Sequence, residues 1–341
     1  HSTSRRQRQM CIRDSKYIGI IGGTGTIGSI IVKYLLQLQT HFHVLIGGRR
    51  SIKEISMSTF YNSERLKYNQ MNYNNDVELD NFCSQCLLVI NAVGPSFKIN
   101  DKIALHALRN NCHYIDIGGY GILRDLLKPY EKSIEAQKLC FIIGVGWMPG
   151  ISGVFSKTII ETHLNSPENT NFNIYYGAVD NWSYSSTYDL AASSMGKTRS
   201  YVYSHGKEIQ VSPFRYTHHK FFPFIGHKKI CMPSFDEQLT QLATSLKQIR
   251  KISTFIMLND YISMGKFMFI KIFYKHNLNK ATLMLQDDYQ RLVKKENKWG
   301  SVICQVSKIE PERKIDTFYY LYTKNNLLYT ALPAVITTQY I

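Results

Sequence analysis

The chain has 341 residues, a formal net charge of +16 at pH 7, 44% hydrophobic and 19% charged residues. This predicts a globular protein with room for two domains, and no apolar run reaches the roughly 20 residues that span a bilayer. The lysines are scattered, so we attribute the basic charge to compositional bias and exclude a nucleic-acid-binding protein. The seven cysteines lack regular spacing, which favours a reducing, cytoplasmic environment and no metal site.

The first half of the chain alternates between strand and helix patterns. Residues 1–15 have no useful periodicity, resemble translated cloning sequence and are expected to be a non-native tail. After them the patterns predict strands at 17–21, 42–46, within the polar stretch 69–76, and at 87–93, 113–117 and 140–143, with helices at 29–38, 52–61, 101–110 and 123–138. This alternation predicts an α/β fold with a Rossmann-type parallel sheet covered on both faces.

A glycine-rich turn joins the first strand to its helix. It reads Gly22-Gly23-Thr24-Gly25-Thr26-Ile27-Gly28, and the strand–turn–helix context favours a dinucleotide-binding turn over an ordinary glycine-rich turn. We expect Gly23 to adopt a positive φ, Gly25 to let the backbone approach a pyrophosphate, and Gly28 to let helix and strand pack closely. Free N–H groups and the helix dipole would then face the phosphates.

The second strand ends without a carboxylate. In a nucleotide-binding sheet an Asp or Glu at this point would bind the 2′-OH of the NAD ribose. Here Gly47-Gly48-Arg49-Arg50 follows the strand, and a guanidinium pairs with a 2′-phosphate and stacks on adenine. The pair predicts NADP(H) in preference to NAD(H); the alternative is that both arginines begin a surface helix.

A further turn follows the strand at 87–93. Ligands of open α/β sheets lie beyond the carboxyl ends of the strands, so this turn should border the nicotinamide, unless it is an ordinary strand-to-helix loop. The candidate cofactor-binding residues of the turn are Asn91, Ala92, Val93, Gly94 and Pro95.

After Gly150 the strand–helix alternation ends and strand patterns predominate. Strands are predicted at 172–179, 200–203, 229–232, 281–285 and 299–307, helices at 236–251 and 330–341, and a core-facing helix or strand over 255–274. The last helix has no cap or polar tail, so we expect the natural chain to continue. The predicted organisation is a tail (1–15), an NAD(P)-binding Rossmann domain (16–152), an α+β substrate and dimerisation domain with a largely antiparallel sheet (153–320), and a C-terminal helix (321–341) for which a return to the Rossmann domain is one alternative.

Four motifs together resemble the saccharopine dehydrogenase-like family of NADP-binding reductases. They lie at 22–28, 89–95, 113–117 and 144–150. The resemblance covers roughly 16–153; beyond it only the architecture is similar. It implies a two-domain oxidoreductase that moves hydride between NAD(P)H and an imine. Several amino-acid-forming relatives have Gly-Phe-Asp-Pro-Gly where this chain has Gly146-Trp147-Met148-Pro149-Gly150, so saccharopine is not carried over as the substrate.

Imine reduction needs a proton at nitrogen as well as a hydride. Asp116 ends the strand at 113–117 and is the first catalytic candidate, either positioning a cationic iminium or passing a proton through water; its alternative role is to cap Gly118-Gly119. Tyr120 is the second candidate. The substrate-side candidates, each with a core role as alternative, are Trp147, Asp180, Tyr184 and Tyr188.

The sequence therefore favours an NADP(H)-dependent oxidoreductase acting on a C=N bond of a small biosynthetic substrate. An enoyl or carbonyl reductase of lipid or polyketide assembly is one alternative, and a non-catalytic NADP-binding sensor or scaffold is another. The expected partner is a small molecule, and a homodimer stays open.

Overall fold

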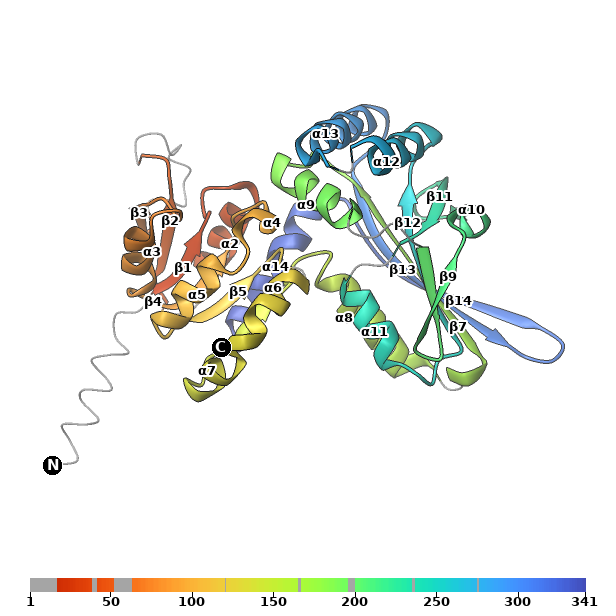
Figure 1. The fold of residues 1–341 in the computed structure, drawn as a ribbon, viewed down its shortest axis with the longest axis horizontal. Helices are drawn as coiled ribbons and strands as arrows, with labels where there is room; N and C mark the ends of the chain where they lie inside the picture. Colours follow the sequence, from red (N-terminus) through yellow and green to blue (C-terminus); the bar gives the residue numbers. More distant parts are fainter. Residues whose placement is uncertain are drawn as a thin grey trace. The chain divides into compact units, whose positions relative to one another are not determined.

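The computed structural model describes residues 17–38, 42–51, 63–119, 121–164, 167–195, 200–234, 237–274 and 276–341. The tail predicted at 1–15, the helix predicted at 52–61 and the catalytic candidate Tyr120 lie outside these ranges. The chain divides into two compact units (Figure 1). Unit 1 contains Trp147 and the residues before it together with Leu327–Ile341, and unit 2 contains Met148–Asn326.

Unit 1 is built on a parallel sheet with the strand order β3-β2-β1-β4-β5-β6. Its strands are β1 (Tyr17–Ile21), β2 (Val44–Gly48), β3 (Leu66–Gln70), β4 (Cys86–Asn91), β5 (His113–Asp116) and β6 (Phe141–Ile143). Every neighbouring pair is parallel. The order reverses beside β1, which creates the crevice where open α/β sheets bind ligands. The predicted Rossmann-type sheet is confirmed.

Helices cover both faces of this sheet. One face packs against α2 (Thr26–Gln37) and α14 (Asn326–Thr338) through apolar residues that include Ile31 and Ala331. The other face packs against α3 (Asp76–Cys83) and α5 (Lys102–Arg109), with Phe82 at its centre. The strands β1, β2 and β4 are largely buried on both sides and read as apolar runs, whereas the edge strand β3 is polar and partly exposed.

The continuous helix predicted at 123–138 is wrong. The chain instead forms α6 (Gly121–Leu127), a 3₁₀ turn η3 (Lys128–Tyr130) and α7 (Glu131–Ala136). Pro129 lies in the 3₁₀ turn, and proline has no N–H for an α-helical hydrogen bond and clashes with the preceding turn. A short helix, α4 (Ser96–Ile99), also follows β4.

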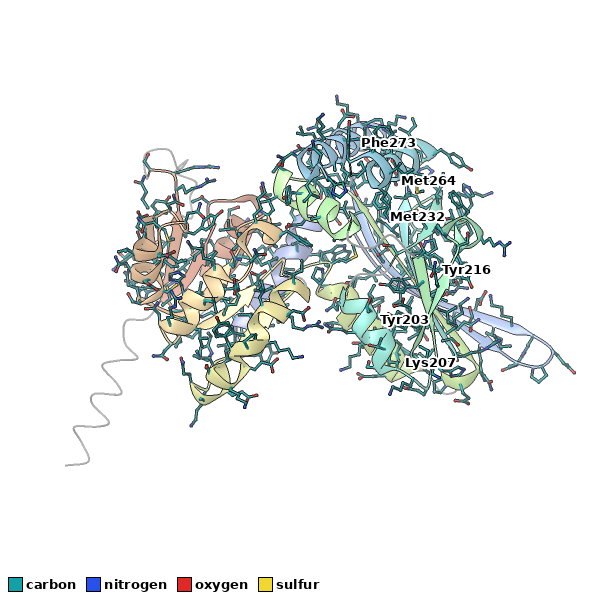
Figure 2. The ribbon with its side chains drawn as sticks, viewed as in Figure 1. Tyr203, Lys207, Tyr216, Met232, Met264 and Phe273 are labelled. Carbon is teal, nitrogen blue, oxygen red and sulfur yellow. The ribbon has the colours of Figure 1, made fainter. Side chains whose placement is uncertain are left out.

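Unit 2 contains an eight-stranded sheet with the path β10-β11-β12-β7-β13-β14, to which β8 and β9 are added beside β12. The strands are β7 (Thr170–Val179), β8 (Ser200–Ser204), β9 (Lys207–Val211), β10 (His218–Phe222), β11 (His227–Pro233), β12 (Lys251–Leu258), β13 (Trp299–Ile309) and β14 (Lys314–Thr323). Only β12 and β7 pair in parallel. The predicted largely antiparallel sheet is confirmed. Figure 2 labels Tyr203 and Lys207 on the β8–β9 hairpin.

Six α-helices and one 3₁₀ turn accompany this sheet within the described part of unit 2. They are α8 (Ile151–His163), η4 (Pro167–Asn169), α9 (Tyr184–Met195), α10 (Pro213–Tyr216), α11 (Glu237–Ser245), α12 (Tyr261–Phe273) and α13 (Leu278–Lys295). Figure 1 shows α9, α12 and α13 grouped together and α8 beside α11.

Two predictions in unit 2 are wrong. The strand predicted at 281–285 is part of α13, because Ala281, Leu285 and Leu292 form one buried helical face and the Asn277 side chain caps the helix. The helix predicted at 236–251 ends at Ser245, since the residues from Lys251 onward pair with β7 as strand β12. The range 255–274, expected as one core-facing helix or strand, divides into the end of β12 and α12.

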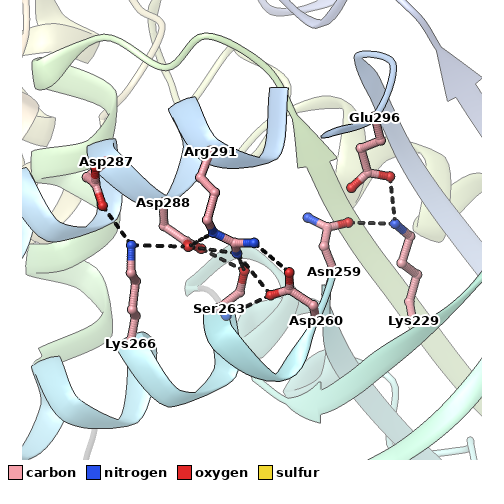
Figure 3. Close-up of polar contacts among 9 residues, drawn as sticks. All are labelled: Lys229, Asn259, Asp260, Ser263, Lys266, Asp287, Asp288, Arg291 and Glu296. Atoms are coloured by element: carbon pink, nitrogen blue, oxygen red, sulfur yellow. Dashed lines mark hydrogen bonds and ion pairs between the residues drawn. The ribbon is translucent and has the colours of Figure 1, made fainter. Parts of the chain in front are cut away.

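A charged network holds α12 and α13 together (Figure 3). The Arg291 guanidinium donates to Asp260 at 2.6 and 2.9 Å and to Asp288 at 2.9 Å. Burial raises the pKa of Asp260, but hydrogen bonds from Arg291 and Ser263 outweigh burial and hold that pKa below its ordinary value of 3.8. The ion pair therefore stabilises this helix pair as long as the carboxylate stays ionised.

A buried lysine lies next to this network. Lys229 is 2% exposed, and its Nζ donates to Asn259 Oδ1 at 2.6 Å and to Glu296 Oε2 at 3.0 Å. Burial lowers the pKa of Lys229, and the Glu296 carboxylate opposes that shift. Because each polar contact comes from a different segment, the ammonium fastens β11 to the ends of β12 and α13.

Candidate cofactor-binding site

Three turns of unit 1 meet at the carboxyl edge of the parallel sheet. In the strand register Ile21 pairs with both Gly47 and Asn91, and Asn91 pairs with Asp116. The residues that follow these strand ends therefore lie side by side. This is the edge where a Rossmann-type sheet binds its ligand.

The glycine turn has the tight geometry expected of it, with one correction. Gly22, not Gly23, has the positive φ, at +84°. Its N–H donates to the Gly47 carbonyl at 2.9 Å and its carbonyl accepts from Gly25 N–H at 2.9 Å. Gly23 is required for a different reason, because a Cβ there would lie 2.8 Å from the Ile46 side chain.

The start of α2 is open to an anion. Gly25 is the N-cap residue, no side chain caps the helix, and its first turn contains no acidic residue. A Cβ on Gly25 would lie 3.1 Å from the Gly22 carbonyl oxygen, and a Cβ on Gly28 would collide with that same oxygen. Backbone N–H groups at a helix N-terminus with no competing side chain suit a phosphate. We call the turn Gly22–Gly25 and the start of α2 the glycine cradle. It fits the pyrophosphate of a dinucleotide.

The arginine pair lies beside this cradle. A Cβ on Gly48 would be 3.5 Å from Thr24 Oγ1, so the end of β2 lies against the glycine turn. The backbone of the pair is held from β3, where Tyr68 Oη donates to the Arg50 carbonyl at 2.6 Å. Both arginines are exposed. No described carboxylate forms an ion pair with either guanidinium, which leaves both charges available to a phosphate.

The Asn91–Pro95 turn is fixed against the glycine turn. Ala92 N–H donates to the Ile21 carbonyl at 2.9 Å, and the Val93 side chain would lie 2.9 Å from a Cβ on Gly22. The buried side-chain amide of Asn91 makes two hydrogen bonds. Its Oδ1 accepts from Val93 N–H at 3.0 Å, and its Nδ2 donates to Asp116 Oδ2 at 2.7 Å. The turn that should border the nicotinamide is therefore tied to β5.

Asp116 accepts hydrogen bonds on both carboxylate oxygens. Oδ2 accepts from Asn91 Nδ2 and from Tyr114 Oη, each at 2.7 Å, while Oδ1 accepts from Gly118 N–H at 2.9 Å and from Gly119 N–H. The residue is 2% exposed. Burial raises its pKa, and the four hydrogen bonds oppose that shift. The cap on the glycine pair, one of the two roles expected for this carboxyl, is present in the structure.

The match to a known protein family falls on this same part of the chain. Residues 18–140 match the family model described as the saccharopine dehydrogenase NADP binding domain. Over these residues unit 1 is similar to a saccharopine dehydrogenase NADP binding domain. The cradle, the arginine pair and the Asn91 turn all lie within the matched residues. No curated protein sequence matches the chain.

Solved structures extend the likeness to the whole fold. The apo saccharopine dehydrogenase (L-Glu forming) from Saccharomyces cerevisiae is similar at a TM-score of 0.62 and 13% identity, over 95% of this chain and 91% of that one. The C. glutamicum DAP dehydrogenase in complex with DAP is 10% identical, with a TM-score of 0.46, over 93% of this chain and 86% of that one. The yeast likeness shows that both units share the fold of a saccharopine dehydrogenase.

A pocket of unit 1 borders Asp116. It holds about 300 Å³ of space, open solvent included. Its lining residues are Asn91, Ser96, Phe97, Ile99, Asn100, Asp116, Gly119, Ile122 and Leu123. The sequence predicted the two polar residues at the strand ends but missed Ser96 and Asn100. Neither has a pattern of its own, because both come from the short segment after the Asn91–Pro95 turn.

Tyr114 is a second residue that the sequence analysis missed. It is fully buried, its hydroxyl donates to Asp116, and burial raises its pKa well above the ordinary value of 10.0. Residues i and i+2 of a strand share a face, so the spacing of Tyr114 and Asp116 was a signal for this pair.

The remaining candidates lie among packing contacts. Trp147 is 8% exposed and packs edge-on against Tyr329 of α14, with ring centroids 5.7 Å apart, inside unit 1. In unit 2, Asp180 is 4% exposed and pairs with Lys298 Nζ at 2.8 Å. It also accepts from Asn181 N–H at 2.7 Å.

Two tyrosine candidates lie on α9 of unit 2. Tyr184 Oη donates to Asn279 Oδ1 at 2.9 Å, and Tyr188 is 8% exposed. The structure thus places Asp180, Tyr184 and Tyr188 in the same unit.

Neither a membrane span nor a metal cluster occurs within the described ranges. These ranges contain no helix long and apolar enough to cross a bilayer. They also contain no cluster of three or more His, Cys, Asp and Glu side chains arranged to hold a metal ion.

Proposed function

We propose that this protein is an NADP(H)-dependent oxidoreductase that reduces a C=N bond of a small biosynthetic substrate. The observation that carries the proposal is the open N-terminus of α2 behind the glycine cradle, with two exposed arginines next to it. Bound NADPH would supply the hydride. The fold is that of an NADP-binding saccharopine dehydrogenase-like oxidoreductase, and the C=N chemistry rests on the resemblance.

Different residues of the site would bind different parts of the cofactor. The backbone N–H groups that follow Gly22 and Gly25 would hold the pyrophosphate. Arg49 and Arg50 would bind the 2′-phosphate, since a guanidinium matches phosphate oxygens in geometry and charge. The turn from Asn91 to Pro95 would position the nicotinamide, because it is fixed by hydrogen bonds at both ends.

Asp116 would supply or position the proton that the substrate nitrogen receives. Its carboxyl borders the pocket, and a pKa raised by burial lets it retain a proton at a higher pH than an exposed carboxyl. It would either exchange that proton with the substrate nitrogen through water or act by holding Asn91 and Gly118 in place. Tyr120 is the second proposed catalytic residue.

The proposed substrate-binding residues are Trp147 of unit 1 and, in unit 2, Asp180, Tyr184 and Tyr188. The shared architecture with the yeast enzyme, over nearly the whole of both chains, supports this division. We place the protein in the cytoplasm, because the described cysteines are all free thiols, as in a reducing compartment.

The decisive experiment follows NADPH absorbance with imine, enoyl and keto substrates in parallel. Oxidation with an imine alone supports the proposal, whereas oxidation with an enoyl or keto substrate alone replaces it. Tight NADPH binding with no oxidation in any reaction assigns the protein to cofactor sensing. Parallel titrations with NADPH and with NADH test the cofactor preference. Equal affinities would refute the role of the arginine pair.

A further inference from the structure

The pocket beside Asp116 has apolar walls and no positive charge. Its walls come from α4 and α6, which follow the neighbouring strands β4 and β5 (Figure 1). Ile99 and Leu123 are each 5% exposed, whereas Ile122 is 48% exposed and reaches solvent. None of the nine residues that line the pocket is lysine, arginine or histidine. A carboxylate that entered the pocket would therefore lose water without gaining a cation.

The buried carboxyl of the lining also disfavours an anion. Asp116 already accepts four hydrogen bonds from groups of unit 1. A carboxylate offers about four acceptor sites, so little of its capacity is left for a ligand. When it is ionised, it also repels a ligand carboxylate as a like charge. The pocket therefore favours an uncharged group with apolar substituents.

Asn100 lines this pocket from a backbone conformation that favours glycine. It ends α4 with a φ of 52° and a ψ of −131°. Asparagine is common in the left-handed helical region, where ψ is about +45°, but a residue with a Cβ is disfavoured at this ψ. Glycine would adopt the same conformation at less cost. Such strain is concentrated at functional sites, where a side chain makes a contact that glycine lacks.

No structural contact explains the side chain of Asn100. Its backbone N–H donates to the Ser96 carbonyl at 3.0 Å, and glycine would form the same hydrogen bond. The residue is exposed, and its side-chain amide makes no hydrogen bond to any other residue that the structure describes. The amide carries two N–H donors and an acceptor oxygen. It is therefore available to a ligand in the pocket.

We propose that this pocket binds an uncharged part of the substrate, an alkyl or aryl group that carries a carbonyl or hydroxyl oxygen. The apolar group would pack against the walls from α4 and α6, and the Asn100 side-chain amide would donate to the oxygen. The inference rests on the proposed function only in calling this ligand a substrate. It excludes a substrate that places a carboxylate beside Asp116.

The test compares two probes of one shape, 4-methylpentanamide and 4-methylpentanoate, by saturation-transfer-difference NMR titration with the full chain. We expect the amide to bind at least about 10-fold more tightly, because the carboxylate has no cation to pair with. Asn100→Gly should weaken amide binding about 3- to 10-fold, the equivalent of one hydrogen bond, without lowering the melting temperature. Ile122→Lys should reverse the preference between the probes, because it supplies a cation to the lining.

Asn111→Gly is the matched control. Asn111 is also an exposed asparagine with a positive φ, at 54°. It precedes β5 and therefore lies at the amino end of that strand, whereas the pocket lies at the carboxyl end. The substitution should leave the affinities of both probes unchanged.

Preferred binding of the amide that Asn100→Gly weakens and Asn111→Gly leaves unchanged supports the proposal. No binding of the amide, equal or tighter binding of the carboxylate, or an amide affinity that Asn100→Gly does not change overturns it. Displacement of the amide by saturating NADPH also overturns it, because the pocket would then belong to the cofactor. Binding of the amide as expected, in a chain that oxidises NADPH with no substrate, would support the ligand site and reject the proposed function.

Discussion

Replacing Asp116 by asparagine changes the side chain that accepts four hydrogen bonds at the edge of the pocket. The amide oxygen of Asp116→Asn can still accept from Gly118 and Gly119, and the Tyr114 hydroxyl can rotate to accept from the new NH₂ group. The Asn91 side chain cannot rearrange its hydrogen bonds in this way. Its Nδ2, 2.7 Å from the present Asp116 Oδ2, would face another NH₂ donor, and its own oxygen already accepts from a backbone N–H. One buried donor therefore loses its acceptor.

A buried donor without an acceptor costs about 1–3 kcal/mol, and the bonds from the two glycines lose their charge assistance as well. The loss of a buried charge offsets part of this, so we expect a net destabilisation of about 2 kcal/mol at neutral pH. For a unit of this size that lowers the melting temperature by roughly 4–8 °C. Differential scanning calorimetry measures it, with Asp125→Asn as the control, because the Asp125 side chain is 67% exposed.

The same variant has a defined pH dependence. Burial raises the folded-state pKa of Asp116 above its ordinary value of 3.8. The pH-dependent part of the stability that this group contributes is therefore fully present below pH 3.8 and is lost as pH rises through the folded pKa. The stability difference between the wild type and Asp116→Asn should shrink as pH rises. A melting temperature within 1 °C of the wild type, or a difference that grows with pH, would refute the reasoning.

Asp116→Asn also separates the two proposed roles of the carboxyl. A residue that exchanges a proton with the substrate should lower kcat and leave the Kd of NADPH unchanged. A residue that acts by holding the turns should weaken NADPH binding together with stability. Near-normal kcat at full NADPH saturation would remove Asp116 from the list of catalytic candidates.

Three more predictions concern the cradle and the charged network. Gly28→Ala should reduce NADPH affinity at least about 10-fold in calorimetric titration, because its methyl group collides with the glycine turn. The pair Arg49→Asp and Arg50→Asp should reverse the preference for NADPH over NADH in the same titration; an unchanged preference would exclude both guanidinium groups from the 2′-phosphate. Arg291→Met should cost about 2 kcal/mol in urea unfolding near pH 7. Hydrogen bonds, against burial, keep the pKa of Asp260 low, so this stability exists above pH 3.8 and disappears as pH falls.

Controls for these variants come from exposed positions of the same chain. Arg313→Met tests an arginine whose side chain is 70% exposed and whose ion pair with Glu310 lies on the surface, so it should leave the urea-unfolding midpoint close to that of the wild type. Arg215→Asp introduces the same charge change as the Arg49 variant at an exposed site on α10. An equal loss of NADPH preference in that control would point to overall charge instead of a local contact.

The central strands of unit 1 were predictable because they are largely buried on both faces. Continuous apolar runs such as Leu87–Ile90 in the sequence are typical of buried parallel strands when helical patterns separate them. Unit 2 offered weaker signals. The strand β14 is largely exposed, with apolar and polar residues on both of its faces, and was missed. The helix α12 has large apolar residues on both its buried and its exposed side, so the apolar residues of its sequence show no clear helical period to distinguish it from a strand.

Parts of the site were predictable for a similar reason. The glycine turn and the arginine pair are contiguous in sequence, and their geometry follows from residues a few positions apart. The positive φ was assigned to Gly23 although Gly22 adopts it, since both glycines permit it and only the packing of Ile46 against Gly23 distinguishes them. Ser96 and Asn100 enter the pocket through the path of a loop, which local patterns do not determine.

The two motifs at 89–95 and 113–117 are parts of one structure. They are two of the four motifs that resemble the saccharopine dehydrogenase-like family, and 25 residues separate Asn91 from Asp116. The hydrogen bond between them joins the ends of adjacent strands, and each side chain also fixes the backbone turn that follows its own strand. Changing Asp116 leaves the buried Asn91 Nδ2 without its acceptor, whereas changing Asn91 leaves the Tyr114 hydroxyl as the donor to Asp116 Oδ2. The turn at Asn91–Pro95 and the loop at Gly118–Gly119 are therefore coupled through Asp116, and a substitution of Asp116 should disturb both.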